Sequence, residues 1–347
     1  KSANYSLMVD YSQRRQSSYD PKHGFNLFNY GHVGRFDMTM DTSLTLGLDG
    51  VYRQEAVPFV SNMTFQASET NPGLASYTNA YYDLFGSSVD LNQLRNGNGL
   101  MNGDTPNSVY NMWNNLGTPY NGFGRLEQNQ FRVTGSGSVS IGDHNISLGF
   151  EYEQRTDRSW GQGDQGPIGI WGQARLLMNK HIAELDLANP IIVNGNGFTA
   201  EYFNRLNTGV AHANGGVYGG AQSGATGGPI DNQSFFDYNV RKALGMDPGS
   251  NEYVVIDQYD PTMFGYEMFS ADELLNNGSS FVSYYGYDHA GNKVKGRTDI
   301  DKYFTEFDAN GNYKRFVGAF QPTYISGYIM DKFAFRDLVF NVGVRVD

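Results

Sequence analysis

Apolar and polar residues alternate along several stretches of the chain, a pattern that predicts β-strands with one apolar and one polar face. Successive side chains of a strand point to opposite faces, so residues two positions apart lie together. In residues 145–155, Ile146, Leu148 and Phe150 alternate with polar residues or glycine. Seven segments of this kind are predicted as strands: 3–13, 31–40, 43–54, 128–141, 145–155, 319–333 and 338–347.

The connections between the predicted strands alternate strictly between short and long. Tight turns join the second strand to the third, the fourth to the fifth and the sixth to the seventh, whereas the long connections cover about 14–30, 55–126 and 156–318. Consecutive connections of an up-and-down sheet lie at opposite ends, so one end would carry the turns and the other most of the chain. Outer-membrane β-barrels have this asymmetry, with short periplasmic turns and long extracellular loops.

Strand length and aromatic residues distinguish a membrane barrel from a soluble β-sandwich, whose strands alternate in the same way. The predicted strands have about 9 to 13 residues, whereas ordinary strands average about 5 to 6 and tilted membrane strands need about 9 to 11. Tyr5 and Tyr11 bracket Leu7 and Val9, as aromatic girdles bracket the apolar band of a barrel. We therefore predict an all-β membrane protein, an antiparallel up-and-down transmembrane β-barrel with long, partly helical extracellular loops.

The two faces of the predicted strands assign their side chains to lipid or to the barrel lumen. The apolar set is predicted to face outer-membrane lipid: Tyr5, Leu7, Val9, Leu44, Leu46, Leu48, Ile146, Leu148, Phe150, Phe340, Val342 and Val344. The charged set on the opposite face is predicted to face the lumen: Asp10, Asp49, Arg53, Arg132, Glu151, Arg345 and Asp347.

Seven strands do not make a complete barrel. An unpaired strand edge in lipid costs several kcal/mol for each unsatisfied backbone group, and single-chain bacterial barrels have even strand numbers from about 8 upward. We therefore expect residues 1–347 to be part of one larger barrel domain, with the other strands and the contents of the lumen outside this sequence. The opening residues lack the pattern of a signal peptide, so we expect any export signal to lie outside this chain as well.

Composition and charge narrow the function further. Aromatic residues make up 14% of the chain and charged residues 18%, with 43 glycines, a mixture that favours strands and loops over helices. The net charge of −11 argues against nucleic acid as a partner. The absence of cysteine excludes disulfides, thiolate metal sites and cysteine nucleophiles. A mean hydropathy of −0.49 fits a membrane protein only because most of the chain would lie in extracellular loops.

Four segments together resemble the Oar-like TonB-dependent outer-membrane proteins of Bacteroidota. They are FNYGHVGRF at 28–36, WGQARLLMNKHIAELDLANP at 171–190, YYGYDHAGNK at 284–293 and ISGYIMDKFAFRDLVFNVGVRVD at 325–347. The last one is similar to a pattern of TonB-dependent receptors in which a strand ending in Asp-Lys-Phe turns into a strand ending in Gly-x-Arg-x-Asp, here Gly343, Arg345 and Asp347. The first three segments point to the Oar-like branch.

The resemblance implies a barrel of about 22 strands that is occluded by its own plug domain. It also implies coupling to the TonB complex, which uses the proton-motive force of the inner membrane. The plug and the TonB-contacting segment are not found in this sequence, so energy coupling is expected from the resemblance alone.

The long connections contain several candidates for local chemistry. Residues Trp171, Ala174, Met178, Ile182 and Leu185 recur at helical spacing and predict an amphipathic helix that ends at Asn189-Pro190. His181 and Glu184 lie one turn apart on it, but without a second histidine pair we expect an exposed polar face and no metal site. Asp308, Asn310 and Asn312 resemble half of a calcium loop that lacks its bidentate glutamate. We interpret that segment, and Asp288–Asn292, as hairpin turns.

Neither catalysis nor a cofactor is expected. The glycine-rich stretches 96–103 and 214–229 lack the Gly-Lys-Ser/Thr of a phosphate-binding loop, and no set of nucleophile, base and acid is evident. Aromatic residues of the long connections could form a stacking surface for a substrate or could fill small loop cores. The candidates for substrate binding are Tyr81, Tyr82, Trp113 and Trp160.

The sequence therefore predicts an outer-membrane TonB-dependent transporter or receptor that passes or docks a large substrate at the cell surface. A surface lipoprotein or an exported cargo protein is a further possible partner. Two alternatives remain open: a passive porin or adhesin-like barrel without energy coupling, and a soluble, surface-anchored binding protein.

Overall fold

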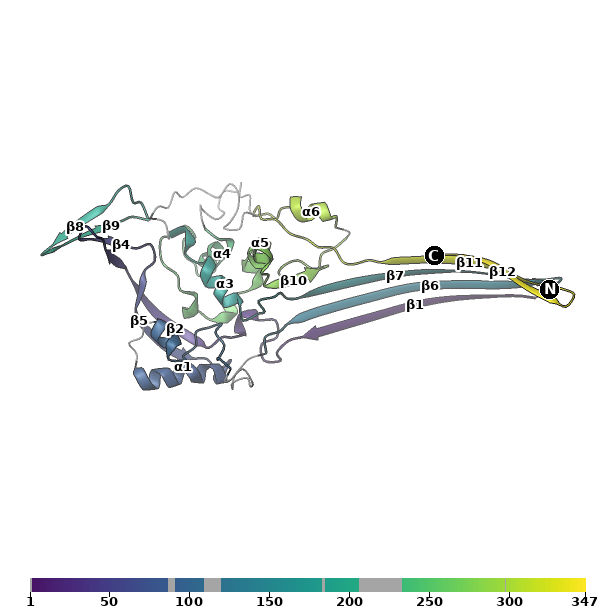
Figure 1. Ribbon diagram of the computed structural model, residues 1–347, viewed down its shortest axis with the longest axis horizontal. Helices are drawn as coiled ribbons and strands as arrows, with labels where there is room; N and C mark the ends of the chain where they lie inside the picture. Colours follow the sequence, from purple (N-terminus) through teal and green to yellow (C-terminus); the bar gives the residue numbers. More distant parts are fainter. Residues whose placement is uncertain (1, 87–90, 109–119, 183–184, 206–232, 297) are drawn as a thin grey trace.

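The computed structural model describes residues 2–86, 91–108, 120–182, 185–205, 233–296 and 298–347. The protein consists of a long, narrow β-sheet that projects from a folded head (Figure 1). Most strand pairs are antiparallel, and all the described helices lie in the head. The prediction of a mainly antiparallel β-structure with partly helical loops is thus confirmed, whereas the head itself is a mixed α/β structure. None of the described helices combines the length and the apolar character needed to cross a membrane.

Five long strands form the projecting sheet, in the order in which they occur along the chain. They are β1 (Ser2–Ser18), β6 (Gly124–Ile141), β7 (His144–Gln162), β11 (Thr323–Phe335) and β12 (Leu338–Val346), and each pairs antiparallel with the next. The short strand β10 (Val282–Tyr285) joins β7 at the head end. In the part of the chain that the structure describes, no pairing links β1 to β12, so the sheet is open.

Tight turns occupy the end of the sheet that lies away from the head. Gly142 adopts a φ of 62° in the turn between β6 and β7, and Arg336 a φ of 53° in the turn between β11 and β12. The left-handed conformation suits such two-residue hairpin turns. The predicted hairpins 128–141/145–155 and 319–333/338–347 are therefore confirmed, and both long connections between strands enter the head.

The predicted hairpin of residues 31–40 and 43–54 is wrong, because both segments belong to the head. Strand β2 (Gly34–Asp41) pairs instead with β5 (Phe59–Ala67). Strands β3 (Leu44–Leu46) and β4 (Val51–Gln54) form a second small sheet with β9 (Phe198–Tyr202) and β8 (Ile191–Gly195). The alternation in β2 arises because side chains such as Phe36 pack into a helix-covered core, which produces the same period of two as lipid does.

Short helices cover the small sheets and build the rest of the head. The α-helices are α1 (Pro72–Phe85), α2 (Leu91–Asn96), α3 (Ile170–Leu177), α4 (Phe235–Ala243), α5 (Ala271–Leu275) and α6 (Ile300–Thr305). The described residues also contain short 3-10 helices: η1 (Leu27–Asn29), η2 (Lys180–Ile182), η3 (Ile256–Gln258), η4 (Pro261–Met263), η5 (Tyr266–Met268) and η6 (Asn276–Gly278). Polar N-cap residues begin two of these helices. At α4 the side chain of Ser234 accepts a hydrogen bond from Asp237 N, and at α5 Ser270 forms a capping box with Glu273.

The head contains two clusters of buried apolar side chains. The larger one surrounds Trp171, whose Nε1 donates to the carbonyl oxygens of Phe28 and Tyr30, each at 3.1 Å. Phe236 and Phe269 stack at 4.1 Å within it. The smaller cluster lies between α1 and the β2–β5 sheet. Aromatic rings bury large apolar areas, so these clusters account for much of the aromatic content outside the long sheet.

The predicted helix over residues 171–185 is shorter than expected. Helix α3 ends at Leu177, Met178 is extended, and Asn179 adopts a left-handed φ of 63°. The side chain of Asn179 explains this break, because its amide donates to Val254 O at 2.7 Å and accepts from Val254 N at 2.9 Å. A buried asparagine that binds another backbone segment at both ends favours a left-handed residue over a further helical turn.

Candidate membrane-facing surface and head cavities

One face of the long sheet is mainly apolar across all five strands. Asp331 also lies on this face, where its carboxylate is 2.7 Å from His144 Nδ1 near the tight turns. The strand register places Leu7 opposite Gly135, and Gly135 opposite Phe150. Leu148 lies opposite Ile329, which in turn lies opposite Val344. The predicted lipid-facing residues of these strands share this face: Tyr5, Leu7, Val9, Ile146, Leu148, Phe150, Phe340, Val342 and Val344.

These side chains are exposed despite their apolar character. Leu7 is 68% exposed, Leu148 53% and Val344 65%, so the described chain provides no second layer over this face. Continuous apolar patches of this kind on a protein surface mark contact with a membrane or another protein. Gly135 leaves room for the Phe150 ring to lie flat across the neighbouring strand, because a Cβ at Gly135 would lie 2.3 Å from that ring.

Aromatic contacts border the apolar face at both ends. Toward the head, Phe131 and Tyr152 make an edge contact at 6.5 Å. Near the tight turns, Phe333 stacks on Phe340 at 5.2 Å and lies 5.4 Å from the His144 ring. The stretch between the borders has about nine residues per strand, or roughly 30 Å at about 3.3 Å per residue before any tilt. A tilted barrel needs an apolar band about 25 Å tall with aromatic girdles.

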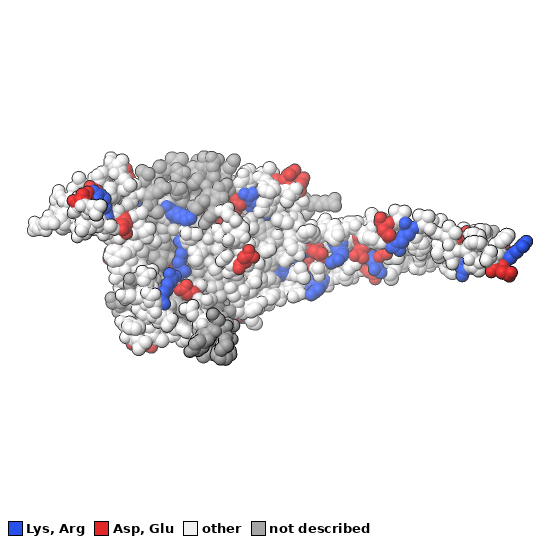
Figure 2. Space-filling view, in the orientation of Figure 1, with Lys and Arg blue, Asp and Glu red and all other residues white. Residues whose placement is uncertain are grey.

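The strands extend past this band toward the head, and there the same face becomes polar. Gln13 and Arg15 continue the row of Leu7 and Val9, and Gln13 donates to Asn129 at 3.0 Å. In Figure 2, which shows one side of the molecule, charges of both signs lie along the half of the sheet next to the head and again at its tip, with a largely uncharged stretch between them. The apolar band is thus limited in height and does not follow the full length of the strands.

The opposite face of the sheet carries polar and charged side chains. Arg132 lies 3.6 Å from both Asp10 and Glu151, and Arg345 lies 2.8 Å from Asp347. These five residues were predicted to face the lumen, and the structure places them together on the face opposite Leu148. The pairs are exposed and contribute at most about 1 kcal/mol each in water.

Five predicted sheet residues lie in the head instead. Leu44, Leu46, Leu48, Asp49 and Arg53 belong to β3, β4 and the loop between them. Their placement in the long sheet is therefore wrong, and the lipid-facing and lumen-facing interpretations lose their basis for them. Arg53 is held by the carboxylates of Asp49 at 2.5 Å and of Glu201 on β9 at 2.8 Å.

The aromatic residues predicted to bind substrate mostly pack inside the head. Trp160 is buried, and its Nε1 donates to the His289 carbonyl at 3.1 Å. Tyr81 is buried in the smaller cluster, and Tyr82 stacks on Phe65 at 5.8 Å. Burial raises the pKa of Tyr82 to about 12. Of the two open interpretations, the filling of loop cores therefore describes Trp160 and Tyr81, whereas Tyr82 is half-buried and Trp113 lies outside the described residues.

The motifs of the long connections have mixed outcomes. His181 is buried beside Asp237, 3.3 Å away, so the predicted exposed face is wrong there, and Glu184 lies outside the described residues. Asp308 accepts hydrogen bonds from the backbone N–H groups of Asn310 and Asn312, each at 2.8 Å, which confirms a hairpin turn. In the described parts of the chain, no group of three or more His, Asp or Glu side chains is placed to hold a metal.

Buried charges and polar groups organise the head. Arg175 donates to both carboxylate oxygens of Asp257, at 2.8 and 2.6 Å, and to the carbonyl oxygen of Asn102 at 2.6 Å. Burial lowers the pKa of His32 to about 4 and raises the pKa of Glu273 to about 7. His32 is therefore neutral at pH 7. Glu273 resists ionisation although its carboxylate accepts backbone N–H groups at 2.7 and 2.8 Å.

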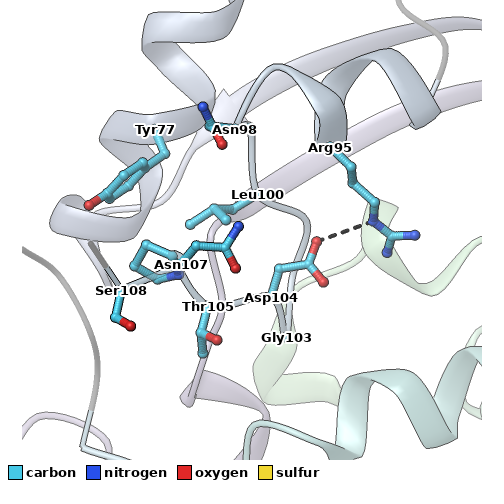
Figure 3. Close-up of a pocket in the computed structure, with 11 residues that line it drawn as sticks. Tyr77, Arg95, Asn98, Leu100, Gly103, Asp104, Thr105, Asn107 and Ser108 are labelled. Atoms are coloured by element: carbon cyan, nitrogen blue, oxygen red, sulfur yellow. Dashed lines mark hydrogen bonds and ion pairs between the residues drawn. The ribbon is translucent and has the colours of Figure 1, made fainter. Parts of the chain in front are cut away.

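Two cavities meet at Arg95, which extends from α2. The first has a volume of about 860 Å³ and polar walls that include Asn98, Asp104 and Thr105 (Figure 3). Arg95 Nε lies 3.4 Å from the Asp104 carboxylate in that view. The second cavity, of about 200 Å³, lies between the two apolar clusters. The first cavity is lined by Tyr77 and by residues of the stretch 95–108. The sequence did not reveal the second cavity because its walls come from five separate segments that only the tertiary fold brings together.

Comparison with known proteins identifies no relative of this chain. No family model matches the chain, and no curated protein or solved structure is significantly similar to it.

Proposed function

We propose that the long sheet is part of an outer-membrane β-barrel and that the head is the extracellular part of an Oar-like TonB-dependent transporter or receptor. The observation that carries this proposal is the exposed apolar band, which is bordered by aromatic rings at both ends and backed by a charged face. Such a band needs hydrocarbon or another apolar layer to cover it. Lipid fits best, because the height of the band is close to the distance between the two aromatic girdles of an outer-membrane barrel.

The topology gives independent support. Both long connections leave the sheet at one end and form the head, and the tight turns lie at the other end. Although residues 31–54 lie in the head, the connections between consecutive strands of the long sheet still alternate strictly: long from β1 to β6, short from β6 to β7, long from β7 to β11 and short from β11 to β12. The open edges at β1 and β12 would then pair with further barrel strands, because unpaired backbone groups are costly in lipid.

Energy coupling and the passage of a large substrate rest on the resemblance of the sequence motifs alone. A passive porin is the main alternative within the same fold. Planar-bilayer recordings of the complete gene product separate the two, since an open porin conducts ions whereas a plugged transporter is electrically silent. Steady conductance at low voltage would favour the porin.

The membrane assignment itself can be tested with single cysteines, because the chain has none of its own. Spin labels at positions 5, 7 and 9 of β1 should be accessible to oxygen dissolved in lipid, and those at 4, 6 and 8 to a water-soluble nickel complex. The alternation should disappear at positions 13 to 17, above the band. Uniform accessibility to the nickel complex at positions 4 to 9 would support the soluble alternative and contradict the proposal.

A further inference from the structure

The smaller head cavity has the composition of a binding site for an apolar group. It lies where the two apolar clusters of the head approach each other, and strands β2 and β5, helices α2 and α3, and residues 253–257 supply its walls. Four methionines contribute to them: Met38, Met40, Met101 and Met178. Methionine side chains are flexible and polarisable, so they adapt to apolar ligands of varied shape.

This cavity is larger than ordinary packing defects. Protein interiors contain few voids bigger than one water molecule, whereas this space measures about 200 Å³ and is partly open to solvent, as a binding pocket is. An engineered apolar cavity of about 150 Å³ stays dry and binds benzene. The space between the clusters therefore fits a group of about eight to ten non-hydrogen atoms.

The polar groups around the cavity favour a hydrogen-bond acceptor at its mouth. Arg175 is neutralised by its two hydrogen bonds to Asp257. Among the described residues, Arg95 has one long polar contact, at 3.4 Å to Asp104, and its side chain is 53% exposed. Asp104 also accepts from Met101 N at 3.0 Å. The guanidinium of Arg95 therefore keeps donors for a ligand that lies along both cavities.

We propose that the head binds an amphipathic ligand, with an apolar group in the methionine-lined cavity and a carboxylate or another acceptor on Arg95. A carboxylate is the strongest partner, because it pairs with the guanidinium in a bidentate geometry. A free medium-chain acid and the C-terminal residue of a peptide share this chemistry. The proposal concerns the head alone and does not depend on what covers the long sheet.

Methyl NMR of the protein labelled with [methyl-¹³C]methionine tests the site directly. Octanoate should shift the methyl signals of the four cavity methionines in a saturable manner, and should leave Met8 and Met330 of the long sheet unchanged. Octanol should bind more weakly and octylamine most weakly. A tripeptide that ends in phenylalanine, compared with its C-terminal amide, shows whether a peptide terminus is the better source of the carboxylate.

Matched variants distinguish the two parts of the site. Arg95→Gln should weaken octanoate binding about tenfold, whereas Arg14→Gln on β1 should not change it. Val60→Phe should fill the cavity and abolish binding, whereas Thr64→Phe on the exposed side of the same strand should not. Met40→Phe serves as a second filling variant if Val60→Phe disturbs folding.

The proposal is overturned if octanoate shifts none of the four signals, or if it shifts the methionines of the whole chain alike. Equal binding of octanoate and octylamine, with no effect of Arg95→Gln, would overturn the role of Arg95. None of these results bears on the spin-label pattern of the sheet, so the two proposals can fail separately.

Discussion

Replacing Leu148 by arginine tests which solvent covers the apolar face of the long sheet. Leu148 lies midway along β7 between Tyr152 and His144, the residues at the two aromatic borders, so it would lie near the centre of a bilayer. An arginine on the lipid face of a barrel costs about 2 to 4 kcal/mol at that depth. Leu148 is 53% exposed, and an exposed residue in water tolerates substitution within about 0.5 kcal/mol.

Ser138→Arg is the matched control. Ser138 lies opposite Ser147, one residue away from Leu148 and on the charged face of the sheet. A lumen filled by water or a polar plug would accept this arginine at much lower cost. The difference between the two variants therefore removes contributions from strand propensity and from net charge.

The assay is reversible urea unfolding of the protein inserted in lipid vesicles, followed by circular dichroism of the strands. We expect Leu148→Arg to lower the free energy of unfolding by about 2 to 4 kcal/mol and Ser138→Arg by less than about 1 kcal/mol. Equal small losses would show that water covers both faces. Equal large losses would mean that the charged face is also buried in an apolar layer, and would refute the assignment of the two faces.

Three further changes test the head, each followed by fluorescence of its buried tryptophans during unfolding. Burial raises the pKa of Glu273 to about 7 from near 4.5, so between these pH values the native carboxyl retains a proton that the unfolded chain releases. The free energy of unfolding should therefore fall by about 3 kcal/mol from pH 4.5 to pH 7. Glu273→Gln should remove this pH dependence, and an unchanged dependence in the variant would contradict the assignment. Asp257→Asn should cost about 3 kcal/mol, because it removes the carboxylate that neutralises the largely buried Arg175, and a loss below about 1 kcal/mol would show that water reaches the pair. Gly103 has a φ of 83°, and a Cβ there would lie 2.6 Å from Trp171 Cβ; Gly103→Ala should therefore cost clearly more than Gly50→Ala, where φ is 80° but no atom lies within 4 Å.

The long hairpins could be predicted from the sequence because two independent signals coincide in them. Alternation defines the strands of β6 and β7, and the Gly142-Asp143 turn defines their pairing. Each pair is also adjacent along the chain, so no long-range information is needed. The order of the five strands then follows from the alternation of short and long connections.

The same alternation led to the wrong pairing for residues 31–54, because alternation shows that one face of a strand is covered but does not show whether lipid or protein covers it. Phe36 faces a core beneath α1, and its pattern matches that of Leu148, which is exposed. Residues 59–67, the true partner of β2, follow the third predicted strand and were assigned to a loop. Their pairing depends on the helix that covers both strands, which is a tertiary property.

The head cavities and the buried aromatic residues were beyond sequence reasoning for a related cause. Trp160 and Tyr81 are as apolar in a core as on a binding surface, and only burial separates the two roles. Arg95 carries no local motif. Its place in the proposed site arises from Met38 and Met178, which other segments bring to the same cavity.

Both long connections begin and end at the same end of the long sheet, and this arrangement affects how the protein can change in evolution. Each connection starts and finishes on neighbouring strands, β1 with β6 and β7 with β11, whose spacing the ladder fixes. The entropy cost of closing a connection rises only with the logarithm of its length. Insertions and exchanges in the head therefore leave strand register intact, and one scaffold can present many different outer surfaces.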